Sequence, residues 1–254
     1  FNKSSGTYVS WNWKANGAGS ANTDGSINST VSANTTSGFS IVTYTGTGSS
    51  ATVGHGLGVA PAFITVKKLD TTDSWQTYHK SLGAGKFMNL NNTDAVSTNN
   101  NRFGGTEPTT SVFSIGTDTG VNGSGGTYVA YCWADKTGYS KFGSYTGNGN
   151  ADGTFIYTGF KPNWVMIKEV AAEGAWRIFD SKRGLGGGNY KNALMADVAS
   201  VEESGATNNI IDALSNGFKL RYSYNDTNGS GSSYIYIAFG QTMVGTNNVP
   251  ATAR

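Results

Sequence analysis

Hydrophobic residues alternate with small or polar residues in many short runs along the chain. The clearest runs cover residues 39–44, 62–67 and 127–133, where β-branched and aromatic residues predominate. An alternation with a period of two residues predicts half-buried β-strands. Gly, Ser and Asn separate the runs, as at 122–125 and 228–231, and such clusters are typical of tight turns. The pattern therefore predicts an all-β protein built from many short strands.

Helical patterns are scarce. Only residues 74–81 and 191–199 have a short, weakly helical periodicity. These two stretches are the only helix candidates, and both are short.

The strand pattern occurs twice. A constant shift of 101 residues places 44–48 on 145–149 and 63–67 on 164–168. Further along the chain the shift grows to about 105, which indicates an insertion in a loop near 183–206. The chain therefore contains two tandem repeats of one strand-rich unit.

A third copy of the last strand lies at the N-terminus, where residues 5–13 resemble 125–133. Either the chain begins partway through a preceding repeat, or the folded unit is permuted relative to the sequence repeat. In both cases one strand is surplus. We expect it to add to a sheet edge, because an unpaired edge promotes aggregation.

These features predict two tandem antiparallel β-sandwich repeats, jelly-roll-like, with a surplus N-terminal strand. The expected units are 1–37, the end strand of a preceding repeat plus a connector; 38–137, the first repeat; and 138–254, the second repeat with a C-terminal tail. Within the connector, Ile27 and Val31 are candidates to anchor a short strand. Almost no linker separates the repeats at 133–139, so we expect them to pack against each other.

Composition restricts the function classes. Only 13% of the residues are charged, whereas aromatic residues make up 12% and there are 36 Gly, so the surface must consist largely of uncharged polar residues. A net charge of +2 without any Lys/Arg run argues against nucleic-acid binding. No apolar run reaches 18 residues, which argues against membrane insertion. The single cysteine, Cys132, cannot form an internal disulfide and is expected to be buried. Because Phe1 is not a methionine, we expect a fragment or a processed product.

The sequence lacks the usual catalytic and metal-binding patterns. It has no Cys/His cluster at zinc spacing, no nucleophile elbow and no phosphate loop. Residues 226–231 resemble the start of a calcium loop, but Ile237 stands where the final Glu would be, so a glycine-rich hairpin is favoured. The sequence predicts no catalytic residue, no cofactor and no metal, and therefore no enzyme.

Four residues are candidate contacts to a ligand or receptor: His55, Trp75, His79 and Trp176. An exposed aromatic ring suits stacking against a sugar. Each residue also has a structural interpretation. Trp75 and Trp176 occupy matched places in the two repeats, which argues for core packing. His55 precedes a strand in a turn, and His79 suits a packed or a surface position.

Several segments resemble a repeat found in tail-associated proteins of marine and cyanobacterial phages, in tail fibres or spikes. They are residues 38–46, 53–61, 128–134, 141–149 and 247–254, so the resemblance covers nearly the whole chain. It implies a virion component without known catalytic residues, and it implies that Arg254 is the true C-terminus. Where that family often has Phe-Ala-Glu after the terminal strand, this chain has Trp-Ala-Asp at 133–135 and Phe-Gly-Gln at 239–241.

The expected function is that of a bacteriophage virion protein, a tail fibre or spike component that attaches to the host surface. A purely structural capsid fibre, decoration protein or tail connector is the alternative. An enzymatic tailspike and a secreted lectin-like protein are further interpretations. The expected partners are other virion proteins, a host-surface glycan or protein, and further copies of the chain. A trimer is favoured, because phage appendages are commonly symmetric.

Overall fold

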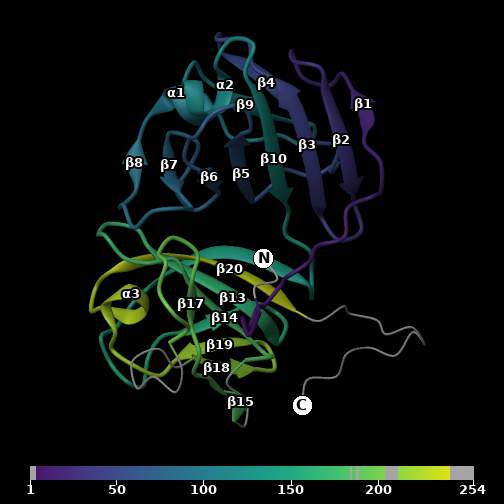
Figure 1. Ribbon diagram of the computed structural model, residues 1–254. Helices are drawn as coiled ribbons and strands as arrows, with labels where there is room; N and C mark the ends of the chain where they lie inside the picture. Colours follow the sequence, from purple (N-terminus) through teal and green to yellow (C-terminus); the bar gives the residue numbers. More distant parts are fainter. Residues whose placement is uncertain (1–3, 184, 187–188, 204–210, 241–254) are drawn as a thin grey trace, which may run out of the picture.

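The computed structural model describes residues 4–183, 185–186, 189–203 and 211–240. The chain is 41% strand and 5% helix, and all of its named strands pair in antiparallel fashion. Figure 1 shows the two repeats as two bodies, one above the other. The all-β sandwich class expected from the alternating pattern is confirmed.

The first repeat consists of a large sheet and a two-stranded sheet. The large sheet has the order β1-β2-β3-β10-β5-β6-β7-β8. Its strands are β1 (Ser20–Asn22), β2 (Ser29–Asn34), β3 (Phe39–Thr45), β5 (Phe63–Lys68), β6 (Gln76–His79), β7 (Lys86–Asn89), β8 (Ser97–Thr98) and β10 (Thr127–Trp133). The small sheet pairs β4 (Ala51–Gly54) with β9 (Val112–Ile115). Two one-turn helices, α1 (Asn100–Phe103) and α2 (Thr119–Asn122), complete the repeat.

The second repeat has two sheets of five strands. The first contains β11 (Ser140–Thr146), β20 (Ser233–Gly240), β13 (Pro162–Glu169), β14 (Arg177–Asp180) and β17 (Leu194–Met195), in that order. The second contains β12 (Phe155–Tyr157), β19 (Gly217–Leu220), β18 (Ile211–Leu214), β16 (Asn189–Tyr190) and β15 (Leu185–Gly186). Helix α3 (Asn225–Asn228) corresponds to α2. Strands β11, β20, β13 and β14 take the places of β3, β10, β5 and β6, so the sequence repeat is also a structural repeat.

Three apolar clusters lie between the sheets. Each repeat has one between its own two sheets, containing for example Ile64 and Tyr128 in the first and Val165 and Tyr234 in the second. The third cluster joins the outer face of the eight-stranded sheet of the first repeat to the outer face of the β11-β20-β13-β14-β17 sheet of the second; we call these the two large sheets. The strands of these two sheets run at a steep angle to each other (Figure 1). The expectation that the repeats pack together is confirmed by this third cluster.

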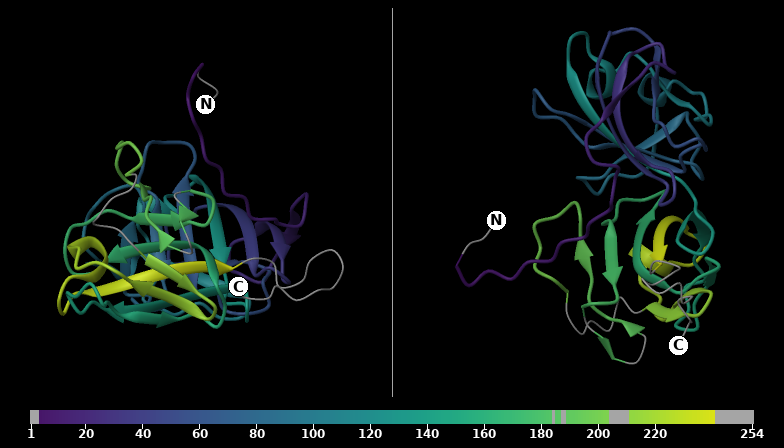
Figure 2. Two further views of the ribbon diagram at one scale, coloured as in Figure 1. Left: turned by 90° about the horizontal axis from the view of Figure 1, so that it is seen from below. Right: turned by 90° about the vertical axis from the view of Figure 1, so that its right-hand side faces the viewer.

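The N-terminal segment differs from the expectation. Residues 6–16 form no strand, so the prediction that residues 5–13 add to a sheet edge is wrong. The homologous place, between β3 and β5, is already filled by β10. Strands β1 and β2, from the stretch expected to be a connector, cover the edge of β3 instead. The N-terminal segment leaves the first repeat as an extended chain towards the second (Figures 1 and 2).

The two weak helical patterns are also overruled. Residues 76–79 form strand β6 and residues 194–195 form strand β17, because cross-strand pairing outweighs a weak local propensity. Cys132 is fully buried on β10, as expected, and burial raises the pKa of its thiol to about 12.

In each repeat a buried asparagine makes hydrogen bonds to a turn, which follows β3 in the first repeat and β11 in the second. The Oδ1 atom of Asn122 accepts a hydrogen bond from the Thr47 backbone N–H at 2.8 Å. Its Nδ2 atom donates to the carbonyls of Ser49 and Gly116, both at 2.7 Å. The turn contains Gly48 with φ +76°, a left-handed conformation that favours glycine. We call this arrangement the asparagine latch.

The latch is duplicated in the second repeat. Asn228 is fully buried, and its Oδ1 atom accepts from the Asn148 backbone N–H at 3.0 Å. Its Nδ2 atom donates to the carbonyls of Asn150 and Tyr222 at 2.9 Å. Because both copies keep the same buried contacts, the latch belongs to the folding of each repeat rather than to their contact.

We expect Asn122→Ala to lower the free energy of unfolding by about 3 kcal/mol, because it removes the three hydrogen bonds that this fully buried side chain makes. Asn228→Ala is expected to cost about as much. Equilibrium unfolding in urea measures both, with Thr36→Ala at an exposed turn as the control. A loss below about 1 kcal/mol in both variants would contradict the latch.

Candidate functional site

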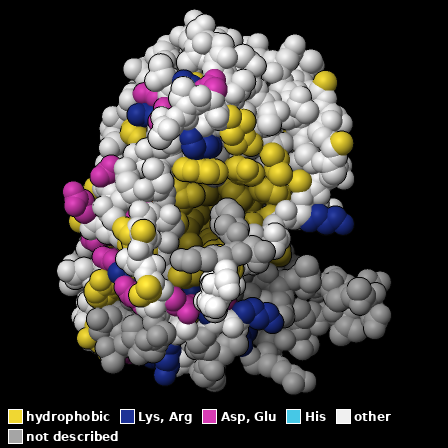
Figure 3. Space-filling model, in the orientation of Figure 1, with side chains coloured by type: hydrophobic (Ala, Val, Ile, Leu, Met, Phe, Trp, Pro, Cys, Tyr) yellow, Lys and Arg dark blue, Asp and Glu magenta, His cyan; other side chains and the backbone are white. Residues whose placement is uncertain are grey.

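An apolar cleft opens between the two repeats. Figure 3 shows it as a hollow between the upper and lower halves, with hydrophobic side chains on its walls. Its volume is about 170 Å³. Its lining residues are Trp13, Phe63, Thr65, Leu90, Trp133, Trp164, Met166, Ile178, Ala196, Ile237 and Phe239. Thr65 is the one residue with a polar group other than an indole N–H, and none is charged, so the cleft suits an uncharged group.

The aromatic walls come from equivalent positions of the two repeats. Trp133 ends β10 and lies opposite Phe63 on β5, with ring centroids 5.6 Å apart. In the second repeat Phe239 lies opposite Trp164 on β13, again at 5.6 Å. Each repeat thus contributes one Phe–Trp pair at equivalent positions, with the two residue types exchanged.

Trp13 joins these two pairs. Its ring lies edge-on to Trp133 at 5.9 Å, to Trp164 at 5.7 Å and to Phe239 at 5.2 Å. In the repeat alignment Trp13 corresponds to Trp133 and Phe239, so the equivalent residues of all three strand copies meet here. The third copy therefore acts through its aromatic residues and not through strand pairing.

Trp11 anchors the same segment nearby. Its Nε1 atom donates to Asp180 at 3.2 Å, and the guanidinium of Arg183 lies 5.6 Å from the centre of its ring. Arg183 also pairs with Asp180 and Glu202, both at 2.5 Å. The N-terminal segment is therefore held against the second repeat by aromatic packing and by a charged group.

Three buried polar atoms of the cleft residues have no hydrogen-bond partner in the described structure. They are the Nε1 atoms of Trp133 and Trp164 and the Oγ1 atom of Thr65. Buried polar atoms in native proteins usually have a partner. The surface that the cleft exposes is apolar, and these three polar atoms are buried behind it.

Polar contacts beside the cleft hold the repeats together. Trp176 donates from Nε1 to the Asn89 carbonyl at 3.0 Å, and Lys168 donates from Nζ to the Thr93 carbonyl at 3.2 Å. His79 Nδ1 accepts from the Ser81 N–H, so Nε2 carries the proton that faces the Tyr236 carbonyl at 3.2 Å. Burial lowers the pKa of His79 to about 4 and also lowers the pKa of Lys168.

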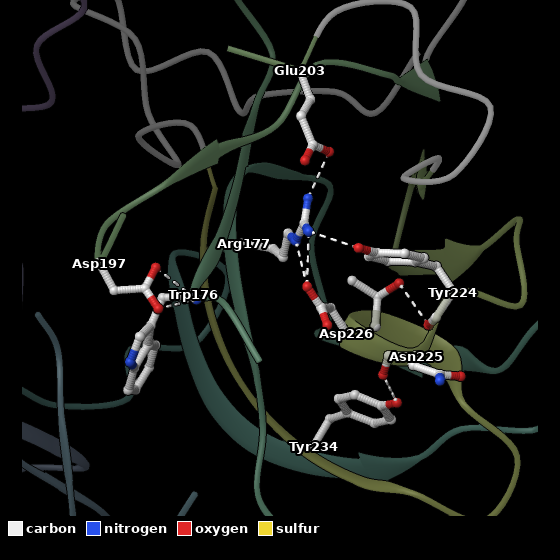
Figure 4. Close-up of polar contacts among 9 residues, drawn as sticks. Trp176, Arg177, Asp197, Glu203, Tyr224, Asn225, Asp226 and Tyr234 are labelled. Carbon is white, nitrogen blue, oxygen red and sulfur yellow. Dashed lines mark hydrogen bonds and ion pairs between the residues drawn. The ribbon is translucent and has the colours of Figure 1, made fainter. Parts of the chain in front are cut away.

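A charged cluster braces the second repeat next to Trp176 (Figure 4). Arg177 on β14 pairs with Glu203 at 2.6 Å and with Asp226 at 2.8 Å, and it donates to the Tyr224 hydroxyl at 3.1 Å. Asp197 accepts from the Trp176 backbone N–H at 3.2 Å, and burial raises the pKa of its carboxyl group. The cluster fixes β14 to α3 and to the segment around Glu203.

The side chains of residues 226–231, which resemble the start of a calcium loop, have other partners in the structure. The Asp226 carboxylate is engaged by Arg177, and the Asn228 side chain is engaged in the latch. Among the described residues, no group of three His, Cys, Asp or Glu side chains could hold a metal ion.

The described helices include none that is long and apolar enough to cross a membrane.

Three of the four candidate contact residues are buried, so the structure does not support a receptor-contact role for them. His55 is 0% exposed; its Nδ1 atom accepts from the Leu57 N–H, and its Nε2 atom lies 3.2 Å from the Thr109 carbonyl. His79 and Trp176 are 1% exposed and contact the other repeat. Each is buried because it satisfies backbone groups that would otherwise lack partners. Trp75 is partly exposed and stacks on Tyr131 at 6.2 Å.

The sequence interpretation did not single out the residues that form the cleft. The signal was nevertheless present, because an aromatic residue recurs at 13, 133 and 239 and at 63 and 164. What the repeat could not reveal is that these positions face each other across two sheets.

Comparison with known proteins gives one assignment. The model of a domain of unknown function, DUF7483, matches residues 1–242. The chain belongs to the DUF7483 family. No curated protein and no solved structure matches it. In this DUF7483 chain, the matched region includes both repeats and the Trp11–Trp13 segment, so the aromatic contact between them lies within the family's domain.

Trp13→Ala is expected to lower the free energy of unfolding by about 2 kcal/mol, because it removes a partly buried ring that touches both repeats. It should also speed tryptic cleavage after Lys14, since the segment loses its anchor. Tyr8→Ala serves as the matched control, because Tyr8 is 58% exposed. Equal effects of the two substitutions would contradict the anchoring role.

The free energy of unfolding is expected to decrease as the pH is lowered from about 6.5 to about 4. The pKa of His79 is lower in the folded chain than in the unfolded chain, so the unfolded state binds more protons in this range. The shift corresponds to about 3 kcal/mol. Unfolding curves at pH 7, 6, 5 and 4 measure the effect, and His79→Gln should show a flatter dependence. An unchanged slope in that variant would assign the effect to other groups.

Proposed function

We propose that this DUF7483 protein is a structural component of a bacteriophage virion, part of a tail fibre or spike that attaches to the host surface. The observation that supports it best is the third apolar cluster, which joins the repeats into one continuous body. Two domains with a small polar contact would move relative to each other, whereas an apolar contact suits a stiff extracellular element.

The latched turns are the proposed receptor-facing surface. Thr47 and Ser49 in the first repeat, and Asn148 and Asn150 in the second, have exposed side chains on turns that buried asparagines hold in place. Uncharged polar groups on a rigid turn can hydrogen-bond a glycan with little loss of conformational entropy. The partly exposed Trp75–Tyr131 stack offers an aromatic face for a sugar ring.

Other copies of the chain and other virion proteins are the proposed partners, with a trimer favoured. One observation favours self-association. β3 is covered by β2, whereas its counterpart β11 pairs only with β20 in the described part of the chain. An uncovered edge strand readily pairs with another chain.

We propose no catalytic role and no cofactor. A purely structural role, as a capsid fibre, decoration protein or tail connector, is the second candidate. It would place the latched turns against other virion proteins instead of a receptor. The low proportion of charged residues suits both roles.

Adsorption of the fluorescently labelled chain to a panel of marine and cyanobacterial strains tests the proposal. We expect saturable binding to a narrow set of strains at physiological salt, with competition by the intact phage. Trp75→Ala should weaken binding about tenfold, if the aromatic stack holds a sugar ring. Leu69→Ala is the matched control, since Leu69 is 58% exposed in the same repeat. No binding by a well-folded sample would favour the purely structural role.

A further inference from the structure

We propose that strand β12 of the second repeat pairs in antiparallel fashion with β12 of a second copy of the chain, about a two-fold axis at Ile156. Strand β12 lies at the edge of its sheet, since it pairs only with β19 in the described part of the chain. The inference does not depend on a role in the virion. It rests on the free backbone groups of this edge, on the side chains beside them and on the equivalent edge of the first repeat.

The outward edge of β12 has four backbone groups without a hydrogen-bond partner among the described residues. The backbone groups of Thr154 and Thr158 bond on the side of β19, at 3.1 and 3.0 Å. Because backbone groups alternate in direction along an antiparallel strand, the N–H and C=O groups of Phe155 and Tyr157 point away from β19. These four groups are therefore free to bond to another strand.

The equivalent edge of the first repeat is covered. Val53 on β4 corresponds to Ile156, because each lies opposite the equivalent phenylalanine of its neighbouring strand. The Thr52 carbonyl beside Val53 accepts from the Ile27 N–H at 3.0 Å, and the Thr52 N–H donates to the Ser26 hydroxyl at 2.9 Å. The first repeat thus uses a segment before β2 to satisfy this edge, whereas the described part of the second repeat leaves it open.

The four free groups are complementary to a second copy of themselves. In an antiparallel pair centred on Ile156, Phe155 lies directly opposite Tyr157 of the second copy, and Tyr157 lies opposite Phe155 of that copy. Each of these two pairs exchanges two N–H···O=C bonds, so every free group of both edges is used. A two-fold contact of this kind joins the same surface of two identical chains. The edge therefore carries its own complement, and a second copy of the chain is the occupant that we infer.

The side chains of β12 favour the same pairing. Phe155 and Tyr157 are 43% and 65% exposed, although both are large and hydrophobic. They project from the outer face of the sheet, whereas Ile156 between them is buried. In the proposed pair each Phe155 lies beside a Tyr157 of the other copy, and such aromatic cross-strand pairs stabilise antiparallel strands.

No protective feature of the strand opposes this contact. Charged residues or proline commonly protect an edge strand, and residues 153–158 contain neither. The sheet of β12 is the layer of the second repeat that lies farther from the first repeat (Figure 1), so the pairing leaves the contact between the repeats unchanged. Because β12 has only three residues, we expect a weak and reversible dimer.

Sedimentation velocity of the full chain between about 10 µM and about 1 mM tests the proposal. We expect a monomer at the low end of this range and mostly dimer at the high end. Amide hydrogen exchange, followed by NMR at the same concentrations, identifies the surface. The amides of Phe155 and Tyr157 should exchange about tenfold more slowly when about nine tenths of the chains are dimeric, because pairing removes them from water.

Substitutions at exposed positions of the same sheet provide the matched variants. Tyr157→Lys should weaken the dimer at least about tenfold, because a lysine on an edge strand opposes pairing. The monomer should stay folded, since the side chain is 65% exposed. Tyr157→Phe keeps the aromatic pair and should keep the dimer. Leu214→Lys adds the same charge on β18, away from the edge, at a side chain that is 36% exposed, and it should also keep the dimer.

Three results would overturn the proposal. They are a chain that stays monomeric at about 1 mM, an association that survives Tyr157→Lys, and exchange rates of the two amides that do not depend on concentration. A trimer that survives Tyr157→Lys would contradict this contact and leave the trimer of the proposed function in place.

Discussion

The burial of apolar surface between the two large sheets is the interaction on which the rest of the architecture depends. On β20, Tyr234 and Tyr236 face the core of the second repeat, while Ile235, Ile237 and Phe239 face the first repeat. A central strand with apolar residues on both faces cannot leave one of them in water without losing stability. Neither repeat is therefore a finished sandwich by itself, and their contact is part of the fold.

The constant sequence shift separates two kinds of residue. Asn122 in the first repeat and Asn228 in the second occupy equivalent positions and bind equivalent turns. They therefore stabilise each repeat separately. Some positions that face the other repeat differ. His79 donates to a carbonyl of the second repeat, whereas its counterpart Asp180 accepts from Trp11.

Much of the fold could be predicted from the sequence because its main signals are local. The alternating pattern, the turn clusters and the repeat predicted the class, the tandem arrangement and the contact between the repeats. The position of residues 5–13 could not be predicted in the same way. Their pattern matches that of β10, but a strand forms only where an edge is free, and the matching position is already occupied by β10 itself. The added strand came from 29–34, where the alternation is weak and Ser residues are frequent.

The candidate site was harder to predict because rarity in the sequence is a poor guide to exposure. The two histidines were candidates because they are the only ones in the chain, and Trp176 because an aromatic ring can stack on a sugar, yet the hydrogen-bonding group of each is used in the interior. Each satisfies a backbone atom where two segments meet, which is a structural task that few side chains can perform. Phenylalanine and tryptophan attract less attention in an aromatic-rich chain, although their position on opposed sheets creates the cleft.

The place of the cleft links binding to the cohesion of the molecule. Its walls come from both large sheets and from the N-terminal segment, so a molecule bound there would contact all three parts at once. Any ligand that binds the folded state and not the unfolded state stabilises the folded state by mass action. In this architecture that stabilisation would act on the contact between the repeats.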